Sequence, residues 1–225
     1  VEVVLQKTDN AEQPLAENNS REKTQNEITK PSRFNQTHLN KLKALNSCKK
    51  CNLQGANLSQ EKLKKSDMAE SNLSYTNLSH ADLSESNLSG SNLSKANIES
   101  ANLSSANLSK ADLSHANLDT SNLIYASLNG SNLDGARLVK ANLSYAKLIN
   151  SSFKKAILTE ANFIGANLSG ANLSHANLNG ANLKRARMSH GKLKVNLKGA
   201  ELTGANLFHL SLKGINLTGA NLTKA

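Results

Sequence analysis

The sequence predicts an all-β solenoid, a coil with four short sides, because one pattern of five residues repeats along most of the chain. A large apolar residue, usually Leu, recurs at every fifth position from residue 53 to residue 193. A small residue, usually Ala, lies two positions before it, and Asn usually lies between the two. A helix has a period of 3.6 residues and a strand a period of 2, so neither explains this repeat. Five residues suit a short extended segment followed by a corner, and four such sides close a coil of about 20 residues.

Both apolar positions of the repeat are expected to face the interior of the coil. Small residues are needed before each Leu because four sides converge on a narrow space. About nine coils should stack at the strand-pairing distance of about 4.8 Å. Asn side chains should hydrogen-bond to their equivalents on neighbouring coils. Examples of the expected core residues are Leu93, Leu113, Leu133, Phe153 and Phe163.

Two segments precede the repeat. Residues 1–34 are polar and mixed in charge, and they lack a sustained periodicity, which predicts a disordered tail. Residues 35–47 place Leu39, Leu42 and Leu45 on one side of a short helix. A helix of about eleven residues is only marginally stable alone, so we expect it to dock on the repeat domain, residues 48–225.

The repeat units resemble those of the pentapeptide-repeat family, as in ANLSS (101–105), ANLSK (106–110) and ADLSH (111–115). The resemblance covers residues 51–225 and implies a right-handed quadrilateral β-helix. It implies little about activity, because members share a shape rather than a catalytic site. Residues 39–58, LNKLKALNSCKKCNLQGANL, resemble the opening of exported members, including thylakoid-lumen ones. This second resemblance implies a capping helix over 35–47 with a Cys pair beside it, and export to a periplasm-type or lumen-type compartment, with a cytoplasmic location still open.

Cys48 falls on the Leu register and Cys51 on the Ala register, so both side chains should face inward. We favour a local disulfide or a buried pair, and a disulfide would indicate an oxidising compartment. An inert reduced pair and a chemical role are the alternatives. A structural zinc site needs four ligands, and the chain has two Cys residues.

The register breaks once, at residues 193–197, where the next Leu comes four residues later instead of five. We expect one coil to be one residue short there. Positions that are usually small then hold larger residues: Val195, Leu210 and Ile215. No capping helix follows the final coil, and an uncapped end exposes apolar residues and unpaired backbone. Either a partner covers this end or the natural chain continues beyond residue 225. In the first case we expect end-to-end association of two copies through this coil, whose apolar residues are Leu212, Leu217 and Leu222.

The outward-facing residues are the candidates for function. One face gathers four apolar side chains on three consecutive coils: Ile124, Tyr125, Tyr145 and Ile164. Scattered exposed apolar residues are normal, so neutral decoration is one interpretation. Binding of a protein partner is the other, because Tyr and Ile clusters suit the centre of an interface.

Composition and charge argue against several classes of function. The chain carries a net charge of +10, whereas a surface that mimics DNA and protects topoisomerases must be strongly acidic. The basic residues form no stripe and no recognition motif. A nucleic-acid-directed protein, which either binds DNA or protects a topoisomerase, is therefore the less favoured alternative. No apolar run approaches the roughly 18 residues of a membrane span. The acidic, basic and nucleophilic residues form no catalytic constellation. We predict a non-enzymatic scaffold or protein-binding module, without catalytic residues, cofactor or metal site.

Overall fold

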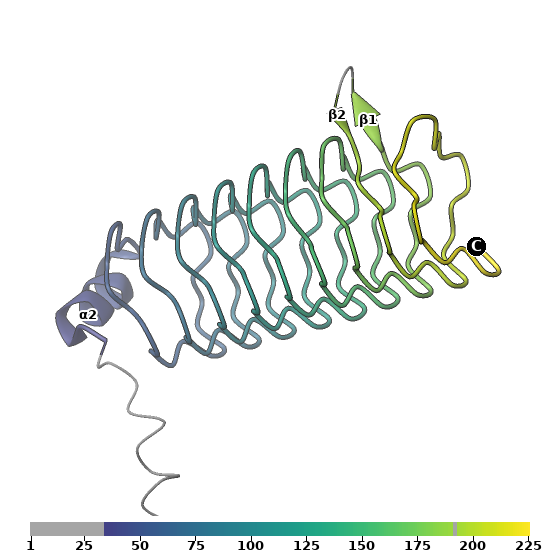
Figure 1. Ribbon diagram of the computed structural model, residues 1–225. Coiled ribbons are helices and arrows are strands. Elements are labelled where there is room, and N and C mark those ends of the chain that lie inside the picture. Colours follow the sequence, from purple (N-terminus) through teal and green to yellow (C-terminus); the bar gives the residue numbers. More distant parts are fainter. Residues whose placement is uncertain (1–33, 191–192) are drawn as a thin grey trace, which may run out of the picture. The chain divides into compact units, whose positions relative to one another are not determined.

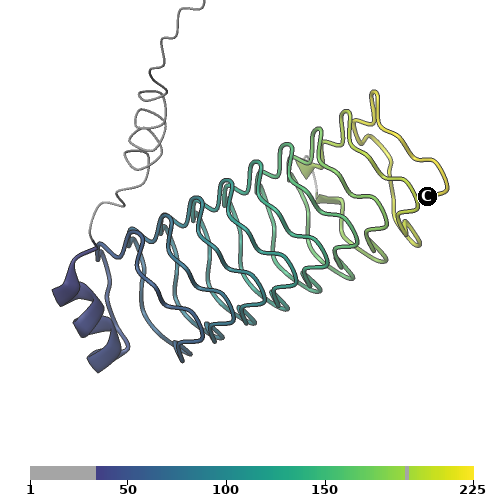
Figure 2. The same ribbon diagram turned by 90° about the horizontal axis from the view of Figure 1, so that it is seen from below.

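The computed structural model describes residues 34–190 and 193–225, which form a repeat β-helix solenoid (Figure 1). Its elements in chain order are α2 (Gln36–Leu45), β1 (Ser189–His190) and β2 (Leu193–Lys194). Between α2 and β1 the chain winds into stacked coils, which Figure 2 shows from a second side. Single parallel bridges, rather than long strands, join one coil to the next. The predicted solenoid is thereby confirmed, whereas nearly all of the predicted tail lies outside the described residues.

Each coil has four sides because a corner closes every five residues. Parallel bridges join positions one coil apart, as between Asn52 and Asn72. At each corner the N–H of the small residue donates to the carbonyl of the preceding Leu, as Ala56 does to Leu53 at 2.9 Å. The residue just before the small one adopts a left-handed conformation, with φ of 55° to 61° at the non-glycine corners. A positive φ at the third residue of a turn bends the chain sharply, which produces the corner.

The core is a stack of Leu and Ala side chains along the solenoid. Leu93, Leu113, Leu133, Phe153 and Phe163 have no exposed surface. The two Phe rings meet edge to face, with centroids 6.4 Å apart. Ser replaces Ala at several small positions, where its hydroxyl can donate to the carbonyl three residues earlier. Such bonds, at 2.7 Å, satisfy the buried hydroxyls of Ser91, Ser121, Ser131 and Ser151.

The Asn position forms the predicted ladder and also braces the corners. The side-chain amide of Asn117 donates to the Asn97 side chain one coil earlier, at 3.2 Å. Asp serves equally well: Asp82 accepts from the Asn102 side chain and from the Ser84 N–H, each at 3.1 Å. Because the Ser84 hydrogen bonds favour the carboxylate, they lower the pKa of Asp82 from its ordinary value. A single Asn or Asp at this position, such as Asn117, can therefore link a coil to its neighbour and also fix its own turn.

The prediction of a short coil at residues 193–197 is wrong, because this coil is longer by four residues. Bridges that cross the region join residues 24 apart, as between Asn172 and Asn196. The additional residues lie in an antiparallel hairpin, in which His190 of β1 pairs with Leu193 of β2.

Leu193 lies five residues after Met188 and so matches the period of the sequence, but it belongs to strand β2 of the hairpin. Met188 occupies the last Leu position before the hairpin, and Val195 occupies the next small position. The N–H of Val195 donates to the Met188 carbonyl at 3.1 Å, which is the ordinary corner bond with a hairpin inserted into it. The solenoid then resumes with Leu197 buried in the core.

Helix α2 covers the first coil. The side chain of Asn35 caps its N-terminus by accepting from the His38 N–H at 3.2 Å. Leu39 and Leu42 are buried against the coil, whereas Leu45 is 66% exposed, which corrects the expectation that all three share one side. Six residues at about 100° each place Leu45 roughly 120° away from Leu39 around the helix.

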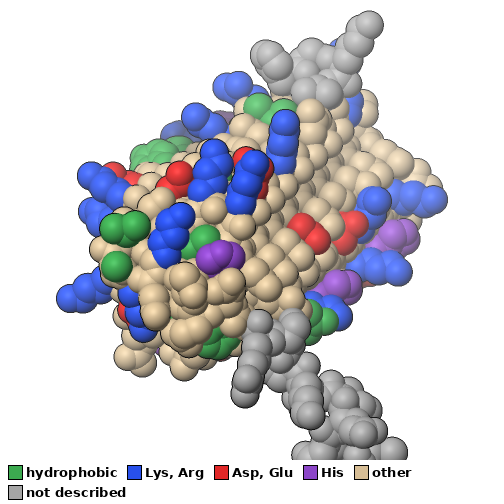
Figure 3. All heavy atoms as spheres, turned by 90° about the vertical axis from the view of Figure 1, so that its left-hand side faces the viewer, with side chains coloured by type: hydrophobic (Ala, Val, Ile, Leu, Met, Phe, Trp, Pro, Cys, Tyr) green, Lys and Arg blue, Asp and Glu red, His purple; other side chains and the backbone are tan. Residues whose placement is uncertain are grey.

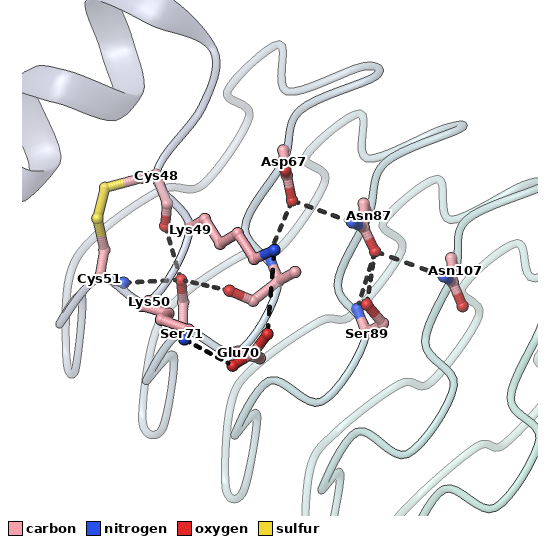
Figure 4. Close-up of polar contacts among 11 residues, drawn as sticks. Cys48, Lys49, Lys50, Cys51, Asp67, Glu70, Ser71, Asn87, Ser89 and Asn107 are labelled. Atoms are coloured by element: carbon pink, nitrogen blue, oxygen red, sulfur yellow. Dashed lines mark hydrogen bonds and ion pairs between the residues drawn. A yellow bond between two sulfur atoms is a disulfide. The ribbon is translucent and has the colours of Figure 1, made fainter.

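Cys48 and Cys51 are joined by a disulfide beneath α2, and both are buried (Figure 4). The hydroxyl of Ser71, on the next coil, accepts from the Cys51 N–H at 3.0 Å and donates to the Cys48 carbonyl at 2.7 Å. Beside it, Glu70 receives ion pairs from Lys49 and Lys50 at 4.0 and 3.4 Å. The disulfide loop is thus attached to the coil that follows it.

In the described part of the chain, no helix combines the length and the apolar character needed to cross a membrane.

Replacing Leu113 by Ala should destabilise the protein by about 2–5 kcal/mol, because a fully buried side chain leaves a cavity between two coils. Enlarging the buried Ala111 to Leu should also destabilise the protein, by about 1–3 kcal/mol, because the interior beside Leu113 has no room for a larger side chain. Urea denaturation followed by circular dichroism measures both. A neutral Ala111→Leu would contradict the narrow interior.

Candidate interaction surface

Corner residues that lie one coil apart form a continuous column on the outside of the solenoid. We call this column the Tyr edge; it consists of the residue pairs 124–125, 144–145, 164–165, 184–185 and 208–209. Backbone hydrogen bonds link each pair to the next. The N–H groups of Tyr125, Tyr145, Gly165 and Arg185 donate to the carbonyls of Ser144, Ile164, Lys184 and Phe208, at 3.1, 2.9, 3.0 and 3.2 Å.

Two tyrosines on this edge form a stacked pair. The rings of Tyr125 and Tyr145 have centroids 5.3 Å apart and planes inclined by 18°. Tyr125 is 61% exposed and Tyr145 is 51% exposed, while Ile124 and Ile164 are half-buried beside them. The four residues of the predicted patch therefore lie on three consecutive coils, around a ring stack that projects into solvent.

Gly165 is the base of this ring stack. A Cβ atom at Gly165 would lie 2.7 Å from Cε1 and 2.8 Å from Cδ1 of Tyr145, so the ring rests against the bare Cα. The same relation occurs twice on another corner, where His115 lies over Gly135 and His175 over Gly199. The rings of Tyr145, His115 and His175 are thus each accommodated by a glycine at the equivalent corner of the next coil.

The Tyr edge continues into a basic and aromatic region. The Lys184 ammonium lies 5.5 Å from the centroid of the Phe208 ring, within cation–π range. The Phe208 ring is 56% exposed and packs against His209, with centroids 3.9 Å apart. Arg185 is exposed. The sequence analysis missed this region because it considered the apolar and basic residues separately.

The N-terminal end of the same column differs in its electrostatics. Lys64 and Lys65 lie on the equivalent corner and form ion pairs with Glu85 at 3.2 and 3.4 Å. The hydrogen bond from Lys64, together with the charge of both lysines, lowers the pKa of Glu85. These cations are therefore partly neutralised by their own chain.

The last coil is the second predicted contact region. Leu212 and Leu217 are half-buried, and Leu222 is 36% exposed. Parallel bridges still attach Asn216 and Asn221 to the previous coil. Among the described residues, Ser211, which precedes Leu212 as Asn216 precedes Leu217, forms no such bridge.

A coil of four short sides, with its apolar residues inside and its variation at the corners, defines a β-solenoid repeat protein. Among the described residues, no three His, Cys, Asp or Glu side chains group closely enough to hold a metal ion. The family described as pentapeptide repeats matches eight copies, over residues 51–90, 81–119, 118–154, 156–194 and 194–223. The chain belongs to the pentapeptide-repeat family.

Solved structures of the same family resemble the chain. HetL from the cyanobacterium Nostoc sp. strain PCC 7120, described as involved in heterocyst differentiation regulation, is 31% identical, with a TM-score of 0.53; the match covers 86% of this chain and 94% of HetL. QnrB1, a plasmid-mediated fluoroquinolone resistance protein, is 24% identical over 73% of this chain and 86% of its own, with a TM-score of 0.36. A thylakoid-lumen protein of Arabidopsis thaliana is 30% identical over 48% of this chain and 69% of its own, with a TM-score of 0.29. No curated protein matches the chain.

Replacing Gly165 by Ala should disrupt the ring stack, because the new methyl group would lie within 3 Å of the Tyr145 ring. Gly130→Ala is the matched control: its φ of +67° is close to the +65° of Gly165, but its nearest neighbour is a Lys110 side-chain carbon at 3.8 Å. We expect Gly165→Ala to cost about 1–3 kcal/mol more than the control in urea denaturation, and to change the near-ultraviolet circular dichroism of tyrosine. Equal costs and unchanged spectra would show that the ring does not depend on Gly165.

Proposed function

We propose that the protein is a non-enzymatic interaction module, a right-handed coil that binds a protein partner through the Tyr edge. The observation that carries the proposal is the exposed stack of Tyr125 and Tyr145 on Gly165. Each ring is held by its neighbour before any partner arrives, so binding should cost little side-chain entropy. Tyr is also enriched among the residues that dominate interface energetics. The description of HetL as involved in regulation agrees with such a role.

Capture of a partner should depend on the ring stack. The double variant Tyr125→Ala/Tyr145→Ala should lose at least tenfold in partner recovered from the native source, since truncated hot-spot residues each cost about 2 kcal/mol or more. Tyr75→Ala is the control, because Tyr75 is also an exposed corner tyrosine, 54% exposed, on a different column. The measurement is a quantitative pull-down with wild type and both variants. Equal capture by all three would exclude the Tyr edge as the partner site.

We further propose that two copies associate end to end through the last coil, with Leu222 at the contact. The support is the exposed Leu222 side chain beside two half-buried leucines, Leu212 and Leu217. Leu222→Lys should shift the protein towards the monomer because it places a charge in an apolar contact. Tyr125→Ala/Tyr145→Ala should leave the association unchanged. Light scattering over a range of concentrations measures both, and a wild-type protein that stays monomeric when concentrated contradicts the proposal.

Export to an oxidising compartment is a third proposal, and the disulfide between Cys48 and Cys51 supports it. Protein taken from its native source without reductant should show no free thiol, and should show two after denaturation and reduction. Mass spectrometry of alkylated peptides counts the thiols directly. Two thiols that react before reduction would remove the argument for export.

A further inference from the structure

The basic residues are concentrated towards one end of the solenoid. Residues 46–160 contain twelve Lys and Arg residues and ten Asp and Glu residues, whereas residues 161–225 contain eight and one. Seen from the α2 end, acidic side chains lie among the basic ones (Figure 3). The net charge of +10 is therefore largely the charge of the last coils.

The two ends also differ in how their cations are paired. In the described part of the chain, every ion pair joins residues between Lys43 and Glu160. Lys184, Arg185 and Arg187, which are exposed or half-exposed, have no carboxylate within 4 Å in that part. These cations are available to an external anion, whereas Lys64 and Lys65 already face Glu85.

Apolar and cationic side chains meet along the Tyr edge. The side of the coil that follows this edge presents Ser127, Lys147, Asn167 and Arg187, which parallel bridges join in that order. Neither the Tyr edge nor these four residues include an Asp or Glu. We call the combination the bipartite surface. Its apolar half is Ile124, Tyr125, Tyr145 and Ile164, and its cationic half is Lys184, Arg185 and Arg187.

We propose that the bipartite surface binds an extended acidic segment of a partner protein, in which apolar residues adjoin a run of Asp or Glu. This inference rests on the proposed function and specifies its partner. Three coil steps of about 4.8 Å separate Ile124 from Lys184, so the apolar and cationic halves span roughly 14 Å. An extended chain at about 3.3 Å per residue covers that distance with four or five residues. Carboxylates at one end would meet both Arg side chains, which can bind them in a bidentate manner.

The geometry favours a polypeptide over a single-stranded nucleic acid. Nucleic-acid platforms stack bases on free aromatic faces along a basic groove. Here Tyr125 stacks on Tyr145, and Tyr145 lies on Gly165, so no base can insert between the rings. Lys147 lies on the coil of Tyr145, whereas Lys184, Arg185 and Arg187 lie one coil or more beyond the rings, so most of the cations follow the rings rather than surround them. An apolar segment that lies across the ring edges, followed by acidic residues, matches this order.

The test is a fluorescence-anisotropy titration of the full chain. The probe is a fluorescein-labelled peptide of two leucines, a phenylalanine, a glycine and four glutamates. A second peptide has glutamine in place of glutamate, and a single-stranded DNA of twelve nucleotides is the competing ligand class. The charge variant is Arg185→Gln/Arg187→Gln. Its matched control is Lys154→Gln/Lys155→Gln, which removes the same charge from two exposed lysines that have no ion pair among the described residues and lie on another corner.

We expect the acidic peptide to bind more tightly than the glutamine peptide, with an affinity that falls as salt rises. Arg185→Gln/Arg187→Gln should weaken it about tenfold, and Lys154→Gln/Lys155→Gln by no more than about twofold. Equal weakening by both charge variants would mean diffuse attraction and would overturn the proposal. So would tighter binding of the DNA with the same dependence on Arg185 and Arg187.

Failure of this inference is distinguishable from failure of the proposed function. If neither peptide binds while the pull-down still depends on Tyr125 and Tyr145, the partner is not an acidic segment and the proposed function stands. If the pull-down does not depend on the tyrosines, the proposed function fails whatever the peptides do.

Discussion

The left-handed residue at every fifth position is the constraint on which the whole structure depends. It closes each turn, so the chain changes direction after every short side and each coil returns above its start. A residue other than glycine pays about 1–2 kcal/mol for this conformation, yet most corners here hold one. Backbone hydrogen bonds to both neighbouring coils and the burial of Leu and Ala compensate for that cost. Each corner side chain is consequently turned outward, which leaves the corners free to vary.

The character of the outer surface depends on which corners lie next to one another. The corner residues of successive coils are close enough for rings to stack and for charges to pair. Tyr125 on Tyr145 and Lys64 with Glu85 are two outcomes of the same geometry. Where an acidic residue follows a basic one on the next coil, the two side chains form an ion pair and neutralise each other. Where rings are followed by cations that have no ion pair among the described residues, as beyond Gly165, the column becomes a surface with one apolar end and one charged end.

Much of the fold could be predicted from the sequence, because period and packing have the same origin. The positions of Leu, the narrow interior and the Asn ladder all follow from a side of five residues. The hairpin at β1 and β2 could not be predicted, because Leu193 preserves the period of five although it belongs to strand β2 of the hairpin. Leu45 was predicted to share the buried side of α2 because it follows Leu42 by three residues. It is exposed because it lies roughly 120° from Leu39 around the helix. At the surface, the patch of Tyr125 and Tyr145 could be identified by column, but its dependence on Gly165 is visible only when rings and glycines are compared one coil apart.

The hairpin formed by β1 and β2 has a consequence for how such a chain can change length. The coil that carries it gains four residues, and yet Asn196 pairs with Asn172 as if nothing had been inserted. A corner bond that spans seven residues, from Val195 to Met188, is as short as many that span three. The stack therefore accommodates an insertion at this corner. Corners are consequently graft points, at which a foreign loop can be displayed at a chosen height along the solenoid without disturbing the coils above and below.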